Sequence, residues 1–456
     1  MEERVIVRRG AYHDSVTLMQ LSRRAGVIAA MGTLLNLELM AGQGFEDVEA
    51  GPNDLVIAIR AEDPEAVLAE VEAALTERGD GGGTAEEPPP RSLRSATRRH
   101  PGLSVACLSI PGPHVPYEAA AALEAGLHVF CFSDGVGLAH EAALKRRALE
   151  RGLLFLGADC GTAIVDGVAF GFANVVERGP VGIVGASGTG IQQVCCLLDA
   201  AGVGISHAIG VGGRDLQAEI GGAMTLRALE LLAHDPDTEA IVVVSKPPDP
   251  DVAHRVREAA PAGAVLFPET LEDGAARAAR AVGAQPAGAE ERLTGPPALG
   301  SVRGLFCGGT LCEEAHRIVG GGDFTDFGAD ELTEGRAHPM IDPSLRLQAL
   351  REAVADDTVA VVLLDVVLGH AAHPDPATEL AEALRARREG QHTIVSLCGA
   401  RGDPQGLDDQ RARLEAAGAV VTRSNAHAAR LARDAAGGRP ASSAADGWPA
   451  PEGAGG

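Results

Sequence analysis

One stretch, residues 180–214, limits what this chain can fold into more than any other. It reads as a short apolar strand, a turn of small residues, a helix with regular apolar spacing, a second strand and a second glycine turn. The first turn contains Ser187, Gly188, Thr189 and Gly190. Such a turn leaves backbone N–H groups unpaired at a helix N-terminus, where the helix dipole also favours an anion. The stretch predicts a parallel α/β unit, with either a phosphate-binding corner or only a tight connection.

A second stretch of the chain repeats this order. Residues 302–319 read as strand, small-residue turn and helix, and the turn contains Gly308, Gly309 and Thr310. The following GGDFTDFG at 321–328 parallels the end of the first copy. Two helix N-termini that face each other would hold a phosphoryl group from both sides. We interpret the two stretches as related flavodoxin-like units, each of which offers one helix start to the same anion.

The rest of the sequence predicts an α/β protein with several parallel-sheet domains, whose ligands lie at the carboxyl ends of the strands. Strand–helix alternation defines the domains, and Gly, Pro and charge-rich composition defines the linkers. The expected divisions are a small α/β module at 1–78, a linker at 79–101, a Rossmann-type domain at 102–178, a flavodoxin-like domain at 179–284, a linker at 285–300, a second flavodoxin-like domain at 301–433 and a disordered tail at 434–456.

Charge and cysteine usage restrict the partners and the compartment. The formal net charge of −24 argues against nucleic acid or an anionic membrane surface as a partner. No run of about 18 uncharged apolar residues is present, and the N-terminus lacks the apolar core of a signal peptide. Eight cysteines without a paired spacing fit a reducing compartment, so we expect a cytoplasmic protein. No Cys/His group has metal-ligand spacing, and no metal site is predicted.

Three polar residues follow strands at the sheet edge where ligands are expected. Asp159 and Thr162 come after the strand at 153–156, and Lys246 comes after the strand at 241–244. We predict that they contact the phosphate or the substrate. For Lys246 the alternative is a solvated side chain that does not reach the crevice.

Three further residues are candidates for catalysis. Arg214 is expected to contact a carboxylate or phosphate with two N–H groups, or else to pair with Asp215 or Glu219. His207 and His338 are candidates for acid–base catalysis or for polarising a carbonyl, with a structural role as the alternative for each. The loop that contains His338 is dense in polar side chains, which favours His338 over His207.

These motifs together resemble the succinyl-CoA synthetase superfamily. Residues 180–214 and 226–246 resemble the flavodoxin-like domain of the α subunit, and residues 304–369 resemble the corresponding domain of the β subunit. Over residues 4–433 the chain is similar to FdrA-type proteins of that superfamily. The resemblance is carried by Asp14-Ser15-Val16, Met31-Gly32-Thr33, Asp159-Cys160-Gly161-Thr162, GASGTGIQ, ISHAIGVGGRDL, VSKPP, GGTLCEEA and GRAHPMIDP.

The resemblance implies an acyl-CoA-synthetase-like enzyme subunit that works in a hetero-oligomer, with a CoA-binding-like domain at 102–178. In succinyl-CoA synthetases the two helix N-termini cradle a phosphohistidine. The segment after 264–267 holds no such histidine, and the glycine-rich CoA loop and the ATP-grasp half are missing as well. Either CoA or a nucleotide is expected if a cofactor binds.

The FdrA-type resemblance also implies a reaction. It points to a subunit of an oxamate carbamoyltransferase in allantoin and purine catabolism, where phosphate attacks oxalurate and yields oxamate and carbamoyl phosphate. The small molecules expected at the site are therefore an acyl or carbamoyl substrate and phosphate. The alternatives are an ADP-forming acyl-CoA synthetase subunit and a non-catalytic acyl-CoA-binding subunit.

Overall fold

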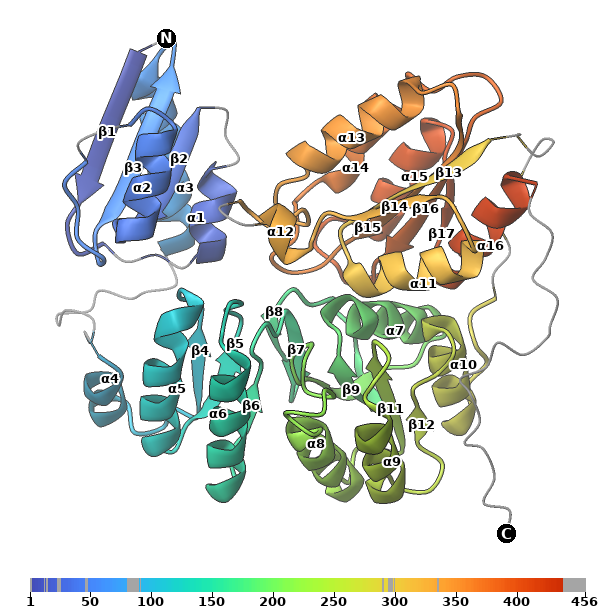
Figure 1. Ribbon diagram of the computed structural model, residues 1–456, viewed down its shortest axis with the longest axis horizontal. Coiled ribbons are helices and arrows are strands. Elements are labelled where there is room, and N and C mark those ends of the chain that lie inside the picture. Colours follow the sequence, from blue (N-terminus) through green and yellow to red (C-terminus); the bar gives the residue numbers. More distant parts are fainter. Residues whose placement is uncertain are drawn as a thin grey trace.

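The computed structural model describes residues 2–11, 13, 15–22, 26–45, 48–79, 90, 92–288, 291–293, 298, 300–333 and 336–437. Asp14 of the first motif, residues 80–89 of the predicted first linker, and the predicted tail beyond 437 lie outside these ranges. The described residues form four β-sheets with helices packed on them, as Figure 1 shows. The expected class, α/β with several parallel sheets, is confirmed.

The first sheet is antiparallel and belongs to a small module at the N-terminus. Its strand order is β1-β3-β2, with β1 (Glu2–Arg8), β3 (Leu55–Ala61) and β2 (Val27–Met31). Helices α1 (Ser15–Ser22), α2 (Leu34–Gly42) and α3 (Pro64–Gly79) cover it. The central strand β3 is apolar from 55 to 59 and completely buried there, because its alternating side chains enter two different core clusters.

The second sheet is parallel, with order β4-β5-β6. It comprises β4 (Val105–Leu108), β5 (His128–Cys131) and β6 (Phe155–Leu156), with the 3-10 turn η1 (Gly112–His114) and helices α5 (Val115–Glu124) and α6 (Leu138–Glu150). Helix α4 (Leu93–Arg99) precedes it, inside the stretch expected to be a linker. Ser92 and Ser95 form a capping box that starts this helix. The Gly, Pro and charge content of the stretch does not predict a helix there.

The third sheet has the order β12-β11-β9-β10-β7-β8. Four of its strands run parallel, namely β9 (Arg178–Ala186), β10 (Ile205–Gly210), β11 (Ala240–Ser245) and β12 (Val265–Leu266). The hairpin of β7 (Thr162–Val165) and β8 (Val168–Gly171) adds an antiparallel edge next to β10. The helices are α7 (Gly188–Ala200), α8 (Ala223–His234), α9 (Pro250–Ala259) and α10 (Leu271–Ala281).

The fourth sheet is parallel, with order β14-β13-β15-β16-β17. Its strands are β13 (Ser301–Phe306), β14 (Asp323–Asp326), β15 (Val359–Val367), β16 (His392–Cys398) and β17 (Val420–Thr422). Its helices are α11 (Gly309–Val319), α12 (Asp330–Thr333), α13 (Ser344–Ala355), α14 (Pro376–Leu384), α15 (Leu407–Ala416) and α16 (Asn425–Ala435). The central strand β15 is buried at all nine residues, as expected of a parallel strand covered on both faces.

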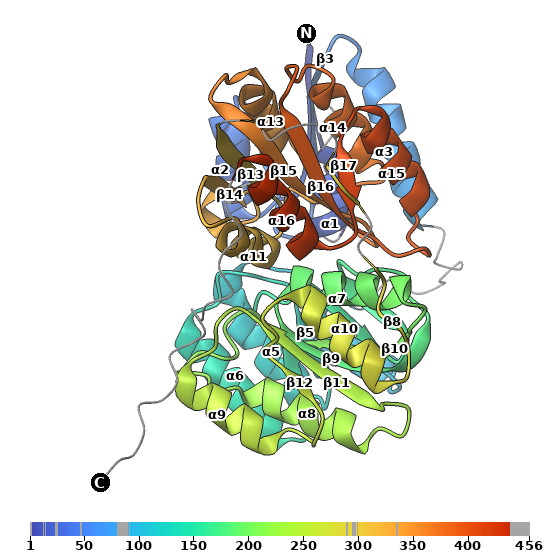
Figure 2. The same ribbon diagram turned by 90° about the vertical axis from the view of Figure 1, so that its right-hand side faces the viewer.

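The last two sheets contain the repeat that the sequence predicts. In each, a strand leads into a helix, and the next strand lies parallel beside the first, as β9-α7-β10 and β13-α11-β14. Helices α7 and α11 face each other where the two units meet, in both views of the ribbon (Figures 1 and 2). One hydrophobic core cluster contains side chains from both units, including Cys196 and Cys398, whose sulfur atoms are 3.7 Å apart.

Candidate functional site

Helix α7 begins at a turn built from small residues. Ser187 is its N-cap residue, and the Ser187 Oγ accepts a hydrogen bond of 2.9 Å from the Gly190 N–H. The N–H groups of Gly188 and Thr189 precede the first intrahelical bond, which Ile191 donates to the Ser187 carbonyl. These two amides therefore lie at the positive end of the helix dipole, where an anion is favoured.

Helix α11 begins differently, because a buried carboxylate holds the chain just before it. The Asp365 carboxylate accepts hydrogen bonds from the Cys307 and Gly308 N–H groups at 2.8 and 2.9 Å and from the Arg346 guanidinium at 2.8 Å. Gly308 occupies the N-cap position and supplies no side-chain cap. The Gly309 and Thr310 amides are thus left at the start of this helix.

The structure brings the two predicted turns together. The Ser187 and Thr310 hydroxyl oxygens are 2.6 Å apart, one from each helix start. A Cβ atom added at Gly308 would lie 2.8 Å from the Thr189 side chain, so glycine is needed for this close approach. The geometric expectation of two converging helix starts therefore holds in the structure. That these turns bind phosphate stays a prediction.

A buried hydroxyl points at the same corner. Thr162, at the start of β7, is 1 % exposed, and its Oγ1 has no hydrogen-bond partner among the described residues. This atom lies 3.2 Å from the position that a Cβ at Gly188 would take. Because buried hydroxyl groups are nearly always hydrogen-bonded, an unpartnered one beside a helix start points to a polar ligand there.

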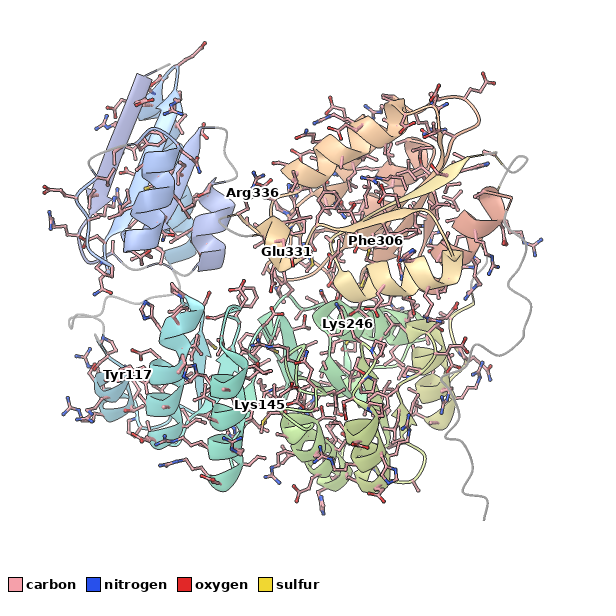
Figure 3. All side chains as sticks on the ribbon, in the orientation of Figure 1. Tyr117, Lys145, Lys246, Phe306, Glu331 and Arg336 are labelled. Atoms are coloured by element: carbon pink, nitrogen blue, oxygen red, sulfur yellow. The ribbon has the colours of Figure 1, made fainter. Side chains whose placement is uncertain are left out.

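Two charged groups flank the start of α11. Lys246, labelled in Figure 3, follows β11, and its Nζ lies 3.6 Å from the position of a Cβ at Gly309 and 3.9 Å from a Glu313 carboxylate oxygen. The Asp326 Oδ2, from the end of β14, lies 2.6 Å from the same point. Burial, together with Asp365, raises the pKa of Asp326, and Lys246 opposes the rise. Asp326 was not predicted as a site residue, although a carboxylate at the carboxyl end of a parallel strand is a usable signal.

His338 lies close to this corner. Its ring packs on Phe172, with centroids 5.4 Å apart, and its Nδ1 accepts a hydrogen bond of 3.2 Å from the Met340 N–H. Its Nε2 lies 2.8 Å from the position of a Cβ at Gly328, and Asp326 Oδ1 lies 3.2 Å from the same position. Burial and the nearby Arg346 lower the pKa of His338 to about 4. A neutral ring that accepts at Nδ1 carries its hydrogen on Nε2, so this residue is suited to donating a hydrogen bond.

His207, in contrast, lies away from the two helix starts. Its Nδ1 accepts a hydrogen bond of 3.0 Å from the Asp166 N–H, and its Nε2 is 3.5 Å from Asp235. Its neighbour Ala208 pairs with Ile183, and α7 starts only after β9 ends at Ala186. His207 is therefore roughly 10 Å or more from the corner at 3.3 Å per strand residue. The structure therefore does not bring His207 to the two helix starts, and a catalytic role for it stays a prediction.

Arg214 is held by a partner that the sequence analysis did not consider. Its Nη2 lies 2.6 Å from a Glu141 carboxylate oxygen and donates to the Val136 carbonyl at 2.7 Å. Neither of the expected partners, Asp215 or Glu219, forms an ion pair with it in the described structure. Glu141 lies on α6, so the pairing joins two segments that are distant in the sequence.

Glu141 belongs to a buried network of charges. Lys145, labelled in Figure 3, is completely buried, and its Nζ is 2.9 Å from Glu141 and 2.8 Å from Asp215. Asp215 in turn accepts hydrogen bonds from the Met224 and Thr225 N–H groups. The sequence does not reveal this network, because Glu141 and Lys145 have the spacing of an ordinary exposed helix pair.

Asp159 lies at the carboxyl end of the second sheet, three residues after β6. Its backbone is in the left-handed region, with φ of 53°, and its N–H donates to the Ser133 carbonyl at 2.9 Å. Burial raises the pKa of the Asp159 carboxyl to about 7, helped by Asp330 and Asp134 and opposed by Arg214, although part of the side chain faces solvent. The Arg214 charge thus acts on the Asp159 carboxyl, and contact of either residue with a substrate stays a prediction.

Comparison with known protein families places both helix starts in CoA-related domains. A family model described as CoA-ligase matches residues 305–435, and one described as CoA binding domain matches residues 176–267. The CoA-binding match thus covers the unit of the third sheet, whereas the resemblance placed such a domain at 102–178. The predicted domain boundaries stay predictions. The fold and the two matched domains define a protein of the CoA-ligase class.

A relative of nearly full length gives the family. The chain is 35% identical to Uncharacterized protein YahF of Escherichia coli strain K12 over 95% of the chain and 98% of YahF. The chain therefore belongs to the succinyl-CoA-synthetase-like family that includes YahF.

More distant relatives share only part of the chain. It is 28% identical to the ADP-forming sulfoacetate-CoA ligase subunit SauD of Bilophila wadsworthia over 34% of its length, and 27% identical to the succinate–CoA ligase α subunit of Aquifex aeolicus over 37%. These matches span about half of each subunit, 54% and 56%. The solved structure of PH0766 from Pyrococcus horikoshii aligns with 73% of this chain and with 83% of the PH0766 chain. The TM-score is 0.32 and the sequence identity is 16%.

The N-terminal module matches a model described as AllF, heavy metal-associated domain, over residues 1–90. These residues include no cysteine. In the part of the chain that the structure describes, no group of three or more His, Cys, Asp or Glu side chains is placed to hold a metal ion. The residues present therefore do not fit a heavy-metal site.

The described residues contain no helix of the length and apolar character that crossing a bilayer requires.

Proposed function

We propose that this chain is the subunit of an acyl-CoA-synthetase-like enzyme that binds inorganic phosphate, or the phosphoryl end of an acyl phosphate, between the starts of α7 and α11. The observation that carries the proposal is the contact between the two turns, where Ser187 and Thr310 hydroxyl oxygens are 2.6 Å apart. Two helix dipoles and the amides at 188–189 and 309–310 would then act on one anion.

The polar side chains around this corner support the same reading. The unpartnered Thr162 hydroxyl faces the start of α7, and the Lys246 ammonium lies beside the start of α11. His338 offers a neutral Nε2–H donor, which is suited to polarising a carbonyl oxygen next to the phosphate. An acyl carbon held between the phosphate and His338 would be attacked directly by a phosphate oxygen.

Direct transfer is the proposed chemistry, because the segment after β12 contains no histidine that could carry the phosphoryl group. There the chain reads FPETLEDGAARAARAVGA and enters α10. The partner subunits expected from the names of the ligase relatives would complete the enzyme as a hetero-oligomer. Binding of CoA or a nucleotide stays a prediction.

For the acyl group we propose a carbamoyl group, transferred between oxalurate and phosphate to give oxamate and carbamoyl phosphate. The support for this choice is the FdrA-type sequence resemblance alone. The alternative of an ADP-forming acyl-CoA ligase subunit is compatible with the family to which the chain belongs.

Phosphate binding can be tested on the full chain with inorganic phosphate in a calorimeter. Replacing both bridging hydroxyls, as Ser187→Ala with Thr310→Val, should weaken phosphate binding about tenfold, because two hydrogen-bonding groups at the anion are lost. The control is Ser206→Ala, which removes one member of another 2.6 Å hydroxyl pair, with Thr238. Ser206 precedes His207 on β10, away from the helix starts, and its loss should leave phosphate binding unchanged.

Two results would contradict the proposed site. One is a wild-type chain that does not bind millimolar phosphate. The other is equal weakening by the double variant and by Ser206→Ala, since that would indicate a general loss of structure. Thermal unfolding of each variant, measured in parallel, separates the second case from a local effect.

A further inference from the structure

The Asp326 carboxyl group is an unexpected neighbour for an anion. Its Oδ2 lies 2.6 Å from the position of a Cβ at Gly309, the first residue of α11, and thus stands beside the amides proposed to bind phosphate. Its Oδ1 accepts a hydrogen bond of 2.9 Å from the Gly328 N–H, while no hydrogen bond to Oδ2 is found in the described structure. An ionised carboxylate in this place would repel a phosphate dianion.

The charges around Asp326 come from every element that packs against it. Asp365 on β15 and Asp330 on α12 are acidic, and Lys246 after β11 is basic. Arg346 is tied to Asp365, and Glu313 on α11 lies 3.9 Å from the Lys246 Nζ. The His338 Nε2 and the Asp326 Oδ1 both lie near the position of a Cβ at Gly328, at 2.8 and 3.2 Å, and the His338 ring is neutral. Around Asp326, the Lys246 ammonium is thus outnumbered by carboxylates. When an anion binds, this excess of negative charge favours the protonated form of Asp326.

We propose that Asp326 is a catalytic acid–base residue of this site, and that its carboxyl group holds the proton exchanged between phosphate and the departing group. The inference rests on the proposed phosphate site. An independent sign that a ligand occupies this corner is the Thr162 hydroxyl, which is buried, unpartnered among the described residues and aimed at the start of α7.

The proton transfers balance without another reactant. An oxygen of hydrogen phosphate forms a bond to the acyl carbon, while the bond from that carbon to the leaving nitrogen or sulfur breaks. The leaving atom keeps the electron pair and takes the proton of the Asp326 carboxyl. The carboxylate then regains a proton from the hydroxyl of the new acyl phosphate, so the residue ends as it began.

Anion binding to the full chain at pH 8 tests this coupling. Titrations in buffers of different ionisation enthalpy measure the protons taken up for each anion bound. Sulfate is used beside phosphate, because sulfate cannot itself take up a proton at this pH. The wild-type chain should take up close to one proton with either anion. Asp326→Asn should take up almost none with sulfate and should bind it about tenfold more tightly than the wild type.

The control variant is Asp323→Asn, the same change at the other end of the same strand, where the exposed carboxylate pairs with Arg303. It should behave as the wild type in both measurements. In the complex with its partner subunits, Asp326→Asn should slow acyl-phosphate formation about 100-fold, as is usual for loss of a general acid.

The outcomes separate this inference from the proposed function. Phosphate binding by the wild type without proton uptake, or proton uptake that persists in Asp326→Asn, would overturn the role of Asp326 and leave the phosphate site standing. A wild-type chain that binds neither anion would overturn the phosphate site itself. Unchanged acyl-phosphate formation in Asp326→Asn would also refute the catalytic role.

Discussion

At the scale of single residues, the neighbours of a titratable group decide what it can do. His338 is kept neutral by burial, so it suits hydrogen-bond donation better than proton transfer at neutral pH. In Asp159 the same effect, burial disfavouring the charged form, raises the pKa of an acid to about 7. Neither charge state can be read from the residue type, because both depend on side chains that are distant in the sequence.

The raised pKa of Asp159 predicts a pH dependence of stability. The pKa of about 7 in the folded chain lies above the ordinary aspartate value of 3.8, so the ionised form is disfavoured in the fold. Its contribution to stability is complete below about pH 4 and is lost as the pH rises to about 7. Asp159→Asn should therefore stabilise the chain at pH 8 and leave it unchanged near pH 4. We expect a gain on the order of 1 kcal/mol, discounted because the side chain is partly exposed.

Urea unfolding of Asp159→Asn at both pH values measures this difference. A matched control is Asp166→Asn, which also replaces an aspartate with a left-handed backbone, φ 51°, but removes an exposed ion pair with Arg178. Asparagine tolerates this backbone conformation in both variants. A gain for Asp159→Asn that is equal at pH 4 and pH 8 would show that relief of backbone strain, and not ionisation, is responsible.

At the scale of elements, the two helix starts are positioned by different devices. Helix α7 has a hydroxyl cap from Ser187, a local signal that sequence alone displays. Helix α11 depends on Asp365, whose carboxylate accepts a hydrogen bond from the Gly308 N–H. Asp365 lies 57 residues further along the chain. The second helix start is therefore placed by tertiary structure.

Loss of Asp365 should destabilise the α11 unit strongly. Asp365→Ala would leave the Arg346 guanidinium buried without its carboxylate and two amides without their acceptor. We expect the free energy of unfolding to fall by about 3 kcal/mol, since an uncompensated buried charge is costly. Denaturant unfolding measures it, with exposed Asp357→Ala as the control, for which a change within about 0.5 kcal/mol is expected. Similar losses in the two variants would contradict this role of Asp365.

At the scale of the whole molecule, the two CoA-related units are joined by a shared core and by buried polar contacts. The Asp403 carboxylate accepts hydrogen bonds of 2.7 Å from the Asn174 side-chain amide and from the Val175 and Ala400 N–H groups. The N-terminal module has core clusters of its own, one of which is built around Ile57 and its neighbours on strand β3. The two helix starts thus meet because the two units dock on each other.

This arrangement predicts separate responses in calorimetry. Asp403→Ala should lower the transition temperature of the two docked CoA-related units by about 3 °C. The loss of a buried acceptor shared by both units should reduce their free energy of unfolding by about 2 kcal/mol, which shifts the transition of so large a body only slightly. The transition of the N-terminal module should not move. A single transition that shifts as a whole would contradict the separation of the cores.

The sequence by itself determined the elements and the repeat. Apolar spacing and glycine turns located α7, α11 and the strands before them, because these signals are local. Helix α4 was not predicted, because its Ser92 cap lies among residues with the composition of a linker. The β7–β8 hairpin joins the third sheet through pairing with β10, a contact that no local pattern displays.

Only the tertiary structure decided which polar residues share the corner. It brought Ser187 and Thr310 together across 123 residues, placed Asp326 beside Gly309 and left the His207 ring with Asp166 and Asp235 as neighbours. The physical reason is that spacing along a strand or helix sets which face a side chain occupies. Its charge and its partners depend on which sheets dock together, and that depends on the shape of whole buried surfaces.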